Sequence, residues 1–544
     1  MLAPMALCVR RARRVYLFAI LTTLLFFGIN LTTLFKRLLL TGHVHLEKRG
    51  ENQVFEIEGL ALGSTFTRPA DSPADKDYAA WLIDSLQLRF QRTMYPDGGG
   101  EIAYPNCTLD PARYANTAFM QHQSRWWNSQ RRSIVSFAIN LHKSENIIPA
   151  QATALLESIV YLLQSNKVYV SIYENGSDDK TRALLSDVGA ALQAIGADGV
   201  WIYSSNMLSN FERYDRIVML SEIRNLALTP LVPYASSEES GGTLLVMNDV
   251  LTCSSDILEL IHQQRFQHAD MAFGTDWISV DRKIRPGEPG YLNDDDPKYI
   301  PDNPPHTKVS LFYDSWVARG ISGNAVYDFT RPGGYSIKSD NESWVTDAYS
   351  TEDATMYQRW LEGHAFPVYS GWGGMSALDA SLFTREHLRF RSTVTAGWTG
   401  GSAVGALGSW GRLVSSEGYL ESDCPGASEC ELVARDIWNM RRGRARIVLA
   451  PQARTAYNIE DWLILSDSVP VTRREEADVL NEDKFDWSEY PIPESVVCIA
   501  TRSAQGEWLD PWGETNNRSR LDPCGVGDCG RENVEHHRST LMAT

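Results

Sequence analysis

The stretch Thr243-Leu-Leu-Val-Met-Asn-Asp-Val-Leu251 decides how this chain of 544 residues is expected to fold. Its apolar residues predict a buried β-strand that ends directly at Asn248 and Asp249. A carboxylate at the point where a strand leaves an open α/β sheet can face the crevice in which such sheets bind ligands. The alternative is that Asp249 only turns the chain or caps the next helix, but Asp256 and Glu259 already have the spacing of a capping box. We therefore treat Asp249 as a candidate functional residue.

Strand and helix patterns alternate on the amino-terminal side of this stretch. Apolar runs of strand length and segments with helical periodicity follow one another. This alternation predicts an α/β fold in which parallel strands are joined by right-handed helical crossovers. The expected strands cover residues 134–139, 167–173 and 199–203, and the expected helices cover residues 149–164, 181–195 and 216–228.

The composition is that of a large globular protein that is not a general nucleic-acid binder. Hydrophobic residues make up 43% of the chain and aromatic residues 10%, which is ample for a large core. The formal net charge of −17 opposes binding to nucleic acid, because the phosphate backbone selects basic surfaces.

The amino-terminal segment is expected to anchor the protein in a membrane. Residues 15–35 carry no charge and are long enough to cross a hydrocarbon core of about 30 Å at a rise of about 1.5 Å per residue. The arginines within residues 10–14 outnumber the basic residues that follow the span, which predicts a cytosolic amino terminus and a lumenal remainder. A cleaved signal peptide is the alternative, but its apolar region is only about 7 to 15 residues long. Glycosylation triplets agree with the lumenal side and occur at Asn106, Asn175, Asn341 and Asn517.

The cysteines are expected to lie in an oxidising compartment, apart from Cys8 on the cytosolic side. Eight cysteines are present, so an odd number remains in the lumen and at least one thiol is free or intermolecular. Cysteines that are close in sequence are expected to pair, and the others cannot be assigned. The expected pairs are Cys424 with Cys430 and Cys524 with Cys529, and the unassigned residues are Cys107, Cys253 and Cys498.

Composition and periodicity divide the chain into six parts. The segment after the anchor is charged and mixed, as in a stem, and the last residues are polar. A Gly-rich run at residues 397–411 lacks the Lys-Ser/Thr of a phosphate-binding loop and predicts a linker or lid. The parts are a cytosolic tail (1–14), a transmembrane anchor (15–35), a stem (36–77), an amino-terminal helical extension (78–132), an α/β domain (133–510) and a loose carboxyl-terminal tail (511–544).

Two further polar clusters carry side chains suited to a nucleotide. Glu174 and Asn175 directly follow the strand predicted at 167–173, where Glu174 could accept hydrogen bonds from a ribose or base. An ordinary strand-to-helix loop is the equal alternative. Within the helix predicted at 216–228, Arg224 could bind a diphosphate through its planar fork and Asn225 could hold sugar or base hydroxyl groups. A solvated Arg224 is the usual alternative, and a glycan on Asn175 would block a site here.

Two more carboxylates follow small or aromatic residues that are typical of strand ends. Asp276 and Asp314 could each orient a sugar hydroxyl group, assist a divalent cation, or simply pair with Arg319. Oxygen ligands with an open position suit Mn²⁺ or Mg²⁺. Zinc is poorly supported because no Cys/His set has ligand spacing. A serine hydrolase is equally poorly supported, because Gly401-Ser-Ala-Val-Gly405 has its serine at the second place.

Taken together and in order, six motifs resemble the fungal cryptococcal mannosyltransferase family, which includes α-1,3-mannosyltransferases and capsule-associated relatives. The likeness extends from about Ser133 to Trp508. It implies a type II Golgi membrane enzyme with a GT-A-like, Rossmann-type mixed sheet flanked by helices. It also implies transfer of mannose from GDP-mannose to a mannoside or glycan acceptor with retention, in cell-wall or capsule synthesis. The motifs begin at Val170 (VSIYENGSDD), Glu222 (EIRNLA), Val246 (VMNDV), Ala269 (ADMAFGTDW), Phe312 (FYDSWVARG) and Ser428 (SECEL).

The resemblance also assigns roles to individual residues. Asn248 and Asp249 stand where the metal-binding acidic motif of the family belongs, with Asn in place of the first carboxylate, so Asp249 is the expected ligand of Mn²⁺ or Mg²⁺. Trp372 lies in a segment that resembles the acceptor side and could stack on a sugar face. Glu429 is a candidate for the acceptor or metal side. In this scheme Asp249, Asp276 and Glu429 are catalytic, Asp314 and Trp372 face the acceptor, and Glu174, Asn175, Arg224, Asn225 and Asn248 bind the nucleotide sugar.

Two other functions stay open on the sequence alone. The chain could be a non-catalytic lumenal scaffold or glycan-binding relative, a hypothesis motivated by Asn248. It could also use a nucleotide sugar other than GDP-mannose.

Overall fold

The computed structural model describes the α/β region and parts of its surroundings, namely residues 54–58, 60, 66, 75–107, 133–163, 166–205, 216–235, 242–283, 306–324, 359, 362–392, 424, 427–468, 484–499 and 518–521. The anchor predicted at residues 15–35 and the Gly-rich run at 397–411 lie outside these residues. Among the described residues, no helix combines the length and apolar character needed to span a membrane.

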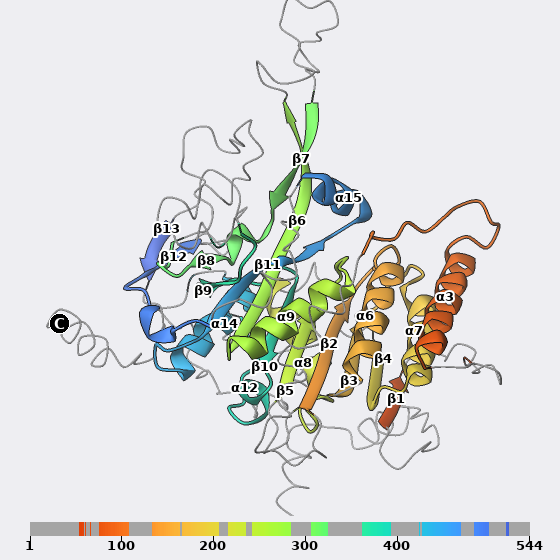
Figure 1. Ribbon diagram of the computed structural model, residues 1–544, viewed down its shortest axis with the longest axis horizontal. Helices are drawn as coiled ribbons and strands as arrows, with labels where there is room; N and C mark the ends of the chain where they lie inside the picture. The colour runs from red at the N-terminus through yellow and green to blue at the C-terminus, as the bar shows by residue number, and fades with distance from the viewer. Residues whose placement is uncertain are drawn as a thin grey trace, which may run out of the picture.

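A mixed sheet of eleven strands organises the molecule, in the order β1-β4-β3-β2-β5-β10-β6-β11-β9-β8, with β7 paired to β6. Figure 1 shows the half that contains β1 to β5 beside the half that contains β6 to β11. A separate small sheet joins β12 and β13. The strands are β1 Val54–Glu58, β2 Ser133–Leu141, β3 Asn166–Glu174, β4 Gly199–Ser204, β5 Gly242–Met247, β6 Met271–Lys283, β7 His306–Phe312, β8 Arg319–Gly320, β9 Phe366–Ser370, β10 Met375–Asp379, β11 Ile447–Ala456, β12 Val496–Ile499 and β13 Arg518–Leu521.

The first half of the sheet is parallel, and the second half is mixed. β1, β4, β3, β2 and β5 all run in the same direction. β10 is antiparallel to both β5 and β6, whereas β11 is parallel to β6. The prediction of an α/β fold with parallel strands in this part of the chain is therefore confirmed, and the complete sheet is mixed.

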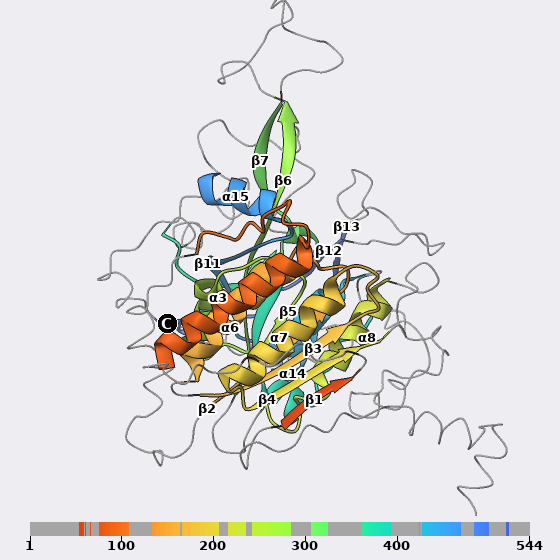
Figure 2. The ribbon, with the colours of Figure 1, turned by 90° about the vertical axis from the view of Figure 1, so that its right-hand side faces the viewer.

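Alternate side chains of the strands enter two different hydrophobic layers, as the period of a β-strand requires. On one face, Val135, Phe137 and Ile139 of β2 pack with α3, α6, α7 and α9. On the other face, Ile134 and Ala138 pack with α8 and α14. Figure 2 shows α3, α6 and α7 together on one side of the sheet. The helices are α3 Asp75–Met94, α6 Ile148–Leu162, α7 Thr181–Ile195, α8 Arg216–Leu228, α9 Ser254–Phe266, α12 Ser381–Thr384, α14 Glu429–Met440 and α15 Ile459–Ser468, with short 3-10 turns η1 Asp314–Trp316 and η3 Trp487–Glu489.

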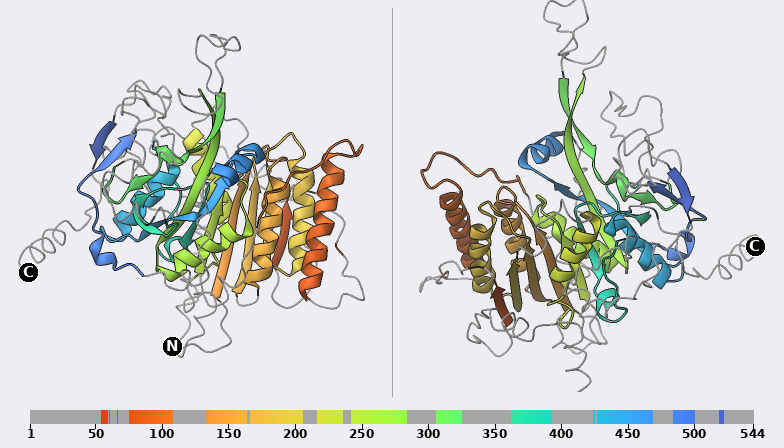
Figure 3. Two further views of the ribbon diagram at one scale, coloured as in Figure 1. Left: turned by 45° about the horizontal axis from the view of Figure 1, so that its top comes forward. Right: turned by 180° about the vertical axis from the view of Figure 1, so that it is seen from behind.

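One strand lies in a segment that the sequence assigns to the stem. β1, Val54–Glu58, pairs in parallel with β4 and forms one end of the sheet, although residues 36–77 show little periodicity. Five residues are too few to give a clear alternation, and their pairing partner lies far along the chain. At the other end, β6 and β7 form a long hairpin that projects beyond the neighbouring elements, as both views in Figure 3 show.

The capping box of α9 differs from its predicted form by three positions. The helix begins at Ser254 with Cys253 as its N-cap, and Asp256 is the N3 residue whose carboxylate accepts a hydrogen bond from the Cys253 amide at 2.8 Å. Asp256 is therefore the N3 residue of the capping box, and Cys253 is the N-cap. The conclusion that Asp249 does not cap this helix is unaffected.

The predicted pairing of Cys424 with Cys430 is wrong. Disulfides join Cys107 to Cys253 and Cys424 to Cys498, and Cys430 is a buried free thiol. The sequence separations of 146 and 74 residues explain why short spacing misled the prediction. The pair Cys524 and Cys529 lies outside the described residues.

Candidate active site

The candidate site lies where the order of the parallel strands reverses. The chain passes from β2 to β3 and β4 on one side and then returns to place β5 on the other side of β2. In an open α/β sheet, the crevice at the carboxyl ends of the strands at such a switch point is where ligands bind. His142 directly follows β2, and Asn248 and Asp249 directly follow β5. The topology thus brings the polar end of the stretch 243–251 to the ligand-binding edge of the sheet.

The backbone of Asn248 is held from two sides. Its amide donates to the carbonyl of Gly374 at 3.0 Å, and its carbonyl accepts from Nε2 of Gln151 at 2.7 Å. Gln151 also donates to the carbonyl of Val250 at 3.2 Å. Because Gln151 belongs to the helix that follows β2, it links the two strands that flank the switch point. The chain that carries Asp249 is therefore fixed before any ligand binds.

A buried arginine connects this strand end to α14. Nη1 of Arg224 donates to Oδ1 of Asn248 at 2.6 Å, while Nε and Nη2 each lie 3.0 Å from Oε1 of Glu429. Nη2 also lies 3.4 Å from Sγ of Cys430. Burial by itself lowers the pKa of Arg224, but the acidic groups around it, the Cys430 thiol and the Glu429 carboxylate, raise it above its ordinary value. Arg224 therefore stays charged although only 3% of its surface is exposed.

Asp249 is the carboxylate of this site that remains partly exposed. Burial raises its pKa to about 6, against the attraction of Arg224, His142 and Arg216, which lowers it. The group is therefore largely ionised at pH 7 and becomes protonated in mildly acidic solution. Asp249 is therefore accessible to a ligand, and the neighbouring positive groups favour its ionised form.

The described residues offer limited protein ligation for a cation. They contain no group of three or more His, Cys, Asp or Glu side chains arranged to hold a metal ion. Oδ1 of Asn248 already accepts a hydrogen bond from Arg224. Asp249 is thus the single carboxylate available at the strand end, which suits Mn²⁺ or Mg²⁺ held by one protein carboxylate, substrate phosphates and water. It does not suit a cage made of protein ligands alone.

Glu174 is enclosed within its own loop. Its carboxylate accepts hydrogen bonds from the Ser177 amide, from Ser204 Oγ and, at 3.0 Å, from Nε of Arg182. Burial raises the pKa of Glu174, but these hydrogen bonds lower it by more, so the group is held as a carboxylate. The structure gives Glu174 the task of fixing the loop between β3 and α7, in place of the predicted contact with a ribose or base.

Two of the three asparagines predicted to bind the nucleotide sugar, Asn175 and Asn225, are hydrogen-bonded to backbone or side-chain groups of the protein. The Asn175 amide donates to the carbonyl of Leu141 at 3.0 Å, and its carbonyl lies 2.8 Å from Nδ1 of His142. Only 1% of Asn175 is exposed, so the folded chain does not present this residue to a glycan-adding enzyme. Asn225 bonds both backbone groups of Phe390, at 2.8 Å and 3.0 Å, and thereby clamps a segment distant in sequence.

Asp276 and Asp314 form a buried acidic pair next to the site. Oδ1 of Asp276 accepts from the Asp314 amide at 2.9 Å, and Oδ2 accepts from the Tyr457 hydroxyl at 2.7 Å. Burial raises the pKa of Asp276 to about 6. Burial and the charge of Asp276 raise the pKa of Asp314 well above its ordinary value. The two side chains therefore join β6, η1 and the residue that follows β11. Arg319 lowers the pKa of Asp314, and the ion pair of either carboxylate with Arg319 stays a prediction.

The Asp314 carboxylate holds the turn between β9 and β10. Oδ2 accepts from the amides of Trp372 and Gly373 at 2.5 Å and 3.1 Å. Gly373 has φ of 58°, and a Cβ atom there would lie 2.2 Å from the carbonyl oxygen of Gly274. Only glycine fits this turn without displacing β6. Asp314 therefore fixes the position of the turn, and its predicted role toward the acceptor stays a prediction.

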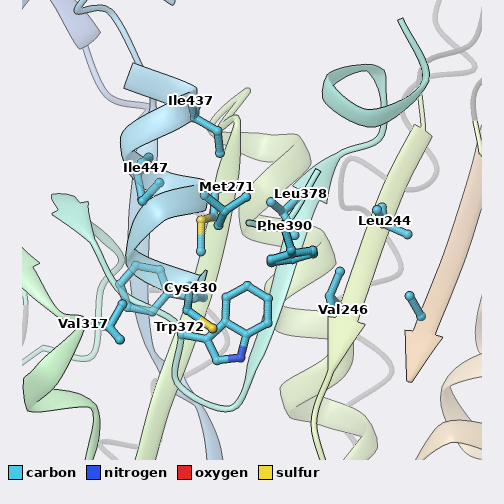
Figure 4. Close-up of a cluster of buried hydrophobic side chains, with 14 of the residues drawn as sticks. Leu244, Val246, Met271, Val317, Trp372, Leu378, Phe390, Cys430, Ile437 and Ile447 are labelled. Atoms are coloured by element: carbon cyan, nitrogen blue, oxygen red, sulfur yellow. The ribbon is translucent and has the colours of Figure 1, made fainter. Parts of the chain in front are cut away.

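Trp372 is buried, so the predicted stacking of its ring on a sugar does not fit the structure. The guanidinium carbon of Arg224 lies 4.5 Å from the ring centroid, and Phe390 meets the ring edge-on at 5.7 Å. Only 3% of Trp372 is exposed. Figure 4 shows its nitrogen at the edge of the ring turned away from Leu378 and Ile437. Among the described residues, this indole N–H has no hydrogen-bond partner.

Several residues of the site escaped sequence reasoning. His142 and Gln151 carry no motif, and their place beside Asn248 follows only from the pairing of β2 with β5. Tyr457 lies in another part of the chain from Asp276, which it contacts. Arg216, the exposed first residue of α8, acts electrostatically on Asp249. The sheet topology is the feature that could have identified His142, because residues that directly follow neighbouring parallel strands lie at the same edge of the sheet.

Comparisons with known proteins find relatives of this chain. The chain matches the family model described as cryptococcal mannosyltransferase 1 over residues 134–403, which include β2 to β5 and the Asn248–Asp249 pair. It is 26% identical over 398 residues to the alpha-1,3-mannosyltransferase of Cryptococcus neoformans var. neoformans, and the match covers 68% of this chain and 69% of that protein.

Likenesses to solved structures are more distant. A mannosyltransferase from Pyrobaculum calidifontis in complex with GDP-mannose and Mn²⁺ is 10% identical, with a TM-score of 0.26 and coverage of 74% of this chain and 69% of that chain. GalNAc-T7 with UDP, GalNAc and Mn²⁺ is also 10% identical, with a TM-score of 0.27 and coverage of 82% and 67%. The family match and the sequence relative together support the cryptococcal mannosyltransferase family, and this chain is a glycosyltransferase.

Proposed function

We propose that this protein is an α-1,3-mannosyltransferase that transfers mannose from GDP-mannose to a mannoside or glycan acceptor with retention. The observation that carries the proposal is the partly exposed Asp249 at the switch point of the sheet, backed by the buried contact of Arg224 with Asn248 and Glu429. This arrangement lies largely within the region that matches the family. It supplies one accessible negative charge on a fixed strand end, as a nucleotide-sugar site requires.

The proposed reaction uses no protein nucleophile. The acceptor oxygen attacks C1 of mannose on the face from which the phosphate departs, so a bond from C1 to the acceptor forms as the bond from C1 to the phosphate oxygen breaks. The acceptor proton passes to the departing phosphate oxygen, and the configuration at C1 is retained. The contribution of the protein is to hold donor and acceptor in this geometry and to stabilise the charge that develops on the diphosphate.

A divalent cation is proposed as the cofactor. Asp249 would hold Mn²⁺ or Mg²⁺, and the cation would supply positive charge to neutralise the leaving group. Asn248 is assigned a structural role beside the cation, because its Oδ1 already accepts a hydrogen bond from Arg224. Glu429 and Asp276 are buried and engaged with Arg224 and Tyr457. We therefore assign them positioning roles and keep Asp249 as the residue that contacts the cation.

The setting of the enzyme is likewise a proposal. The uncharged span at residues 15–35 and its basic flank support a type II anchor in the Golgi membrane with a lumenal catalytic domain. A GT-A-like domain and a product in the fungal cell wall or capsule belong to the same proposal and rest on the resemblance of the six sequence motifs. Membership of an enzyme family favours catalysis over the alternative of a non-catalytic scaffold.

Donor choice is tested by transfer and hydrolysis assays on the full chain in detergent. GDP-mannose, UDP-glucose and UDP-xylose are each offered with Mn²⁺ and again with EDTA. The proposal predicts turnover of GDP-mannose that requires the cation, and weaker or no turnover of the UDP sugars. Turnover of a UDP sugar alone would replace the donor assignment, and no turnover of any donor with a range of mannosides would support the scaffold alternative. Any truncated form should retain β1, because this strand pairs with β4.

A further inference from the structure

The residue that the sequence offers for the donor diphosphate is already occupied. Arg224 directs Nε and Nη2 to Glu429 and Nη1 to Asn248, and its guanidinium covers the ring of Trp372. Withdrawing Nε and Nη2 from Glu429 for a phosphate would leave Glu429 as a buried carboxylate without its cation, which is strongly unfavourable. A diphosphate at this edge of the sheet therefore needs another positive group.

Arg216 is placed to supply that charge. It is the first residue of α8, and its side chain is exposed. Because α8 connects β4 to β5 on its way back across the sheet, its first turn lies at the carboxyl edge of the parallel strands. Arg216 is close enough to Asp249 and to Tyr313, directly after β7, to attract the negative charge of each. Arg216 thus lies within electrostatic range of the carboxylate to which the cation is assigned.

The side chain of Arg216 is also available. Within the described residues, no hydrogen bond or ion pair joins it to another group. Arg224 lies about 12 Å further along the same helix, at a rise of about 1.5 Å per residue, so one helix carries an exposed arginine and a buried one. An arginine fork matches phosphate oxygens, and the first turn of a helix further favours an anion.

An independent observation points to a ligand at the same edge. The indole N–H of Trp372 is buried and lacks a hydrogen-bond partner among the described residues, although Trp372 contacts the arginine that holds Asn248. A buried donor without a partner costs about 1–3 kcal/mol unless a ligand or water satisfies it. In the part of the chain that the structure describes, the edge of the sheet therefore presents a donor and a cation that both lack partners.

We propose that Arg216 binds the diphosphate of the nucleotide-sugar donor, while Arg224 positions Asn248 and Glu429 behind it. This inference rests on the proposed function and names a residue for it. Arg216 contacts the leaving group directly in this scheme, and Arg224 acts only through its partners.

Calorimetric binding of GDP and GMP to the full chain with Mn²⁺ separates the diphosphate from the nucleoside. The variants are Arg216→Gln, Arg216→Lys and the control Arg444→Gln, whose exposed arginine precedes β11 away from this edge. We expect Arg216→Gln to weaken GDP binding roughly 10- to 100-fold and GMP binding much less, because a charged hydrogen-bond donor is lost. Arg216→Lys should recover part of the affinity, since it keeps the charge. Arg444→Gln should bind like the wild type, and all three variants should unfold at the wild-type temperature.

Unchanged GDP affinity in Arg216→Gln would overturn the inference while leaving the proposed function intact. An equal loss of GDP and GMP affinity would overturn it as well, because the second phosphate would then not be the group recognised. A wild-type protein that binds neither nucleotide overturns the proposed donor itself. If the wild type binds UDP and not GDP, the donor assignment fails, and the UDP and UMP pair then decides the role of Arg216 in the same way.

Discussion

Each end of β5 is bound to a buried arginine, and the two arginines have different surroundings. At the amino end, Arg265 of α9 donates to Thr243 Oγ1 at 2.9 Å, to Asn166 Oδ1 at 3.0 Å and to the carbonyl of Ile134 at 3.2 Å. At the carboxyl end, Arg224 of α8 is bound to Glu429 and Asn248. The first set of acceptors is neutral, and the second contains a carboxylate.

The difference separates a structural end of the strand from a functional one. Burial lowers the pKa of Arg265 to about 10, whereas the acidic groups around Arg224 outweigh its burial and raise its pKa. Arg265 ties together the starts of β2, β3 and β5. Arg224 instead stands beside the partly exposed Asp249 and lowers the pKa of that carboxyl. Charged groups, among them Arg224, Glu429 and Asp249, are therefore retained at the carboxyl end of β5, where a ligand can bind.

The largest effect on folding is expected from Arg224→Met. This change leaves Glu429 buried without its cation, and breaking such a pair costs about 3–5 kcal/mol in the free energy of unfolding. Chemical denaturation monitored by tryptophan fluorescence measures the loss. The double variant Arg224→Met/Glu429→Met should recover much of the stability, since an apolar pair of similar volume replaces the ions, but it should not recover transfer activity. Full activity in the double variant would contradict a role for this pair in positioning the site.

A smaller loss is expected from Arg265→Met at the other end of the strand. Its partners are a hydroxyl, an amide and a carbonyl oxygen, and a buried acceptor left without a donor costs about 1–3 kcal/mol. The protein should be less stable, with an unchanged KM for the nucleotide sugar at a temperature where it remains folded. A KM that rises as much as in Arg224→Met would remove the distinction between the two ends.

The pH dependence should show opposite signs for stability and activity at Asp249. Its pKa in the folded protein is about 6, above the ordinary value of 3.8, so the stabilisation from protonating it is complete below the unfolded pKa and is lost as the pH rises through about 6. Cation binding requires the carboxylate, so kcat/KM should rise over the same interval. Activity profiles and thermal unfolding between pH 5 and 8, compared with those of Asp249→Asn, test both signs. A profile of kcat/KM that is flat across pH 6 would argue against a carboxylate with this pKa at the reaction centre.

Local pattern predicted the elements of the parallel half, because burial of one strand face and one helix face leaves a periodic trace in the sequence. The end of β5 and the helix at 216–228 were found in this way. Pattern could not reveal that Arg224 meets Glu429, 205 residues away, or that Cys424 pairs with Cys498. Glu174 illustrates the same limit, because only the fold shows that Ser204 and Arg182 enclose it. The sequence indicated which polar residues matter, and the packing decides which of them face a ligand.

The central claim is that Asp249 at the carboxyl end of β5 holds the cation with the donor diphosphate. The most direct measurement is Mn²⁺-dependent binding of GDP to the full chain, compared between the wild type, Asp249→Asn and the control Asp84→Asn on the exposed side of α3. We predict that Mn²⁺ strengthens GDP binding in the wild type and in Asp84→Asn. In Asp249→Asn this effect of Mn²⁺ should disappear, and transfer should fall on the order of 100-fold or more, since a bound cation contributes several kcal/mol to the transition state. An Asp249→Asn protein in which Mn²⁺ enhances GDP binding and mannose transfer as in the wild type would contradict the account.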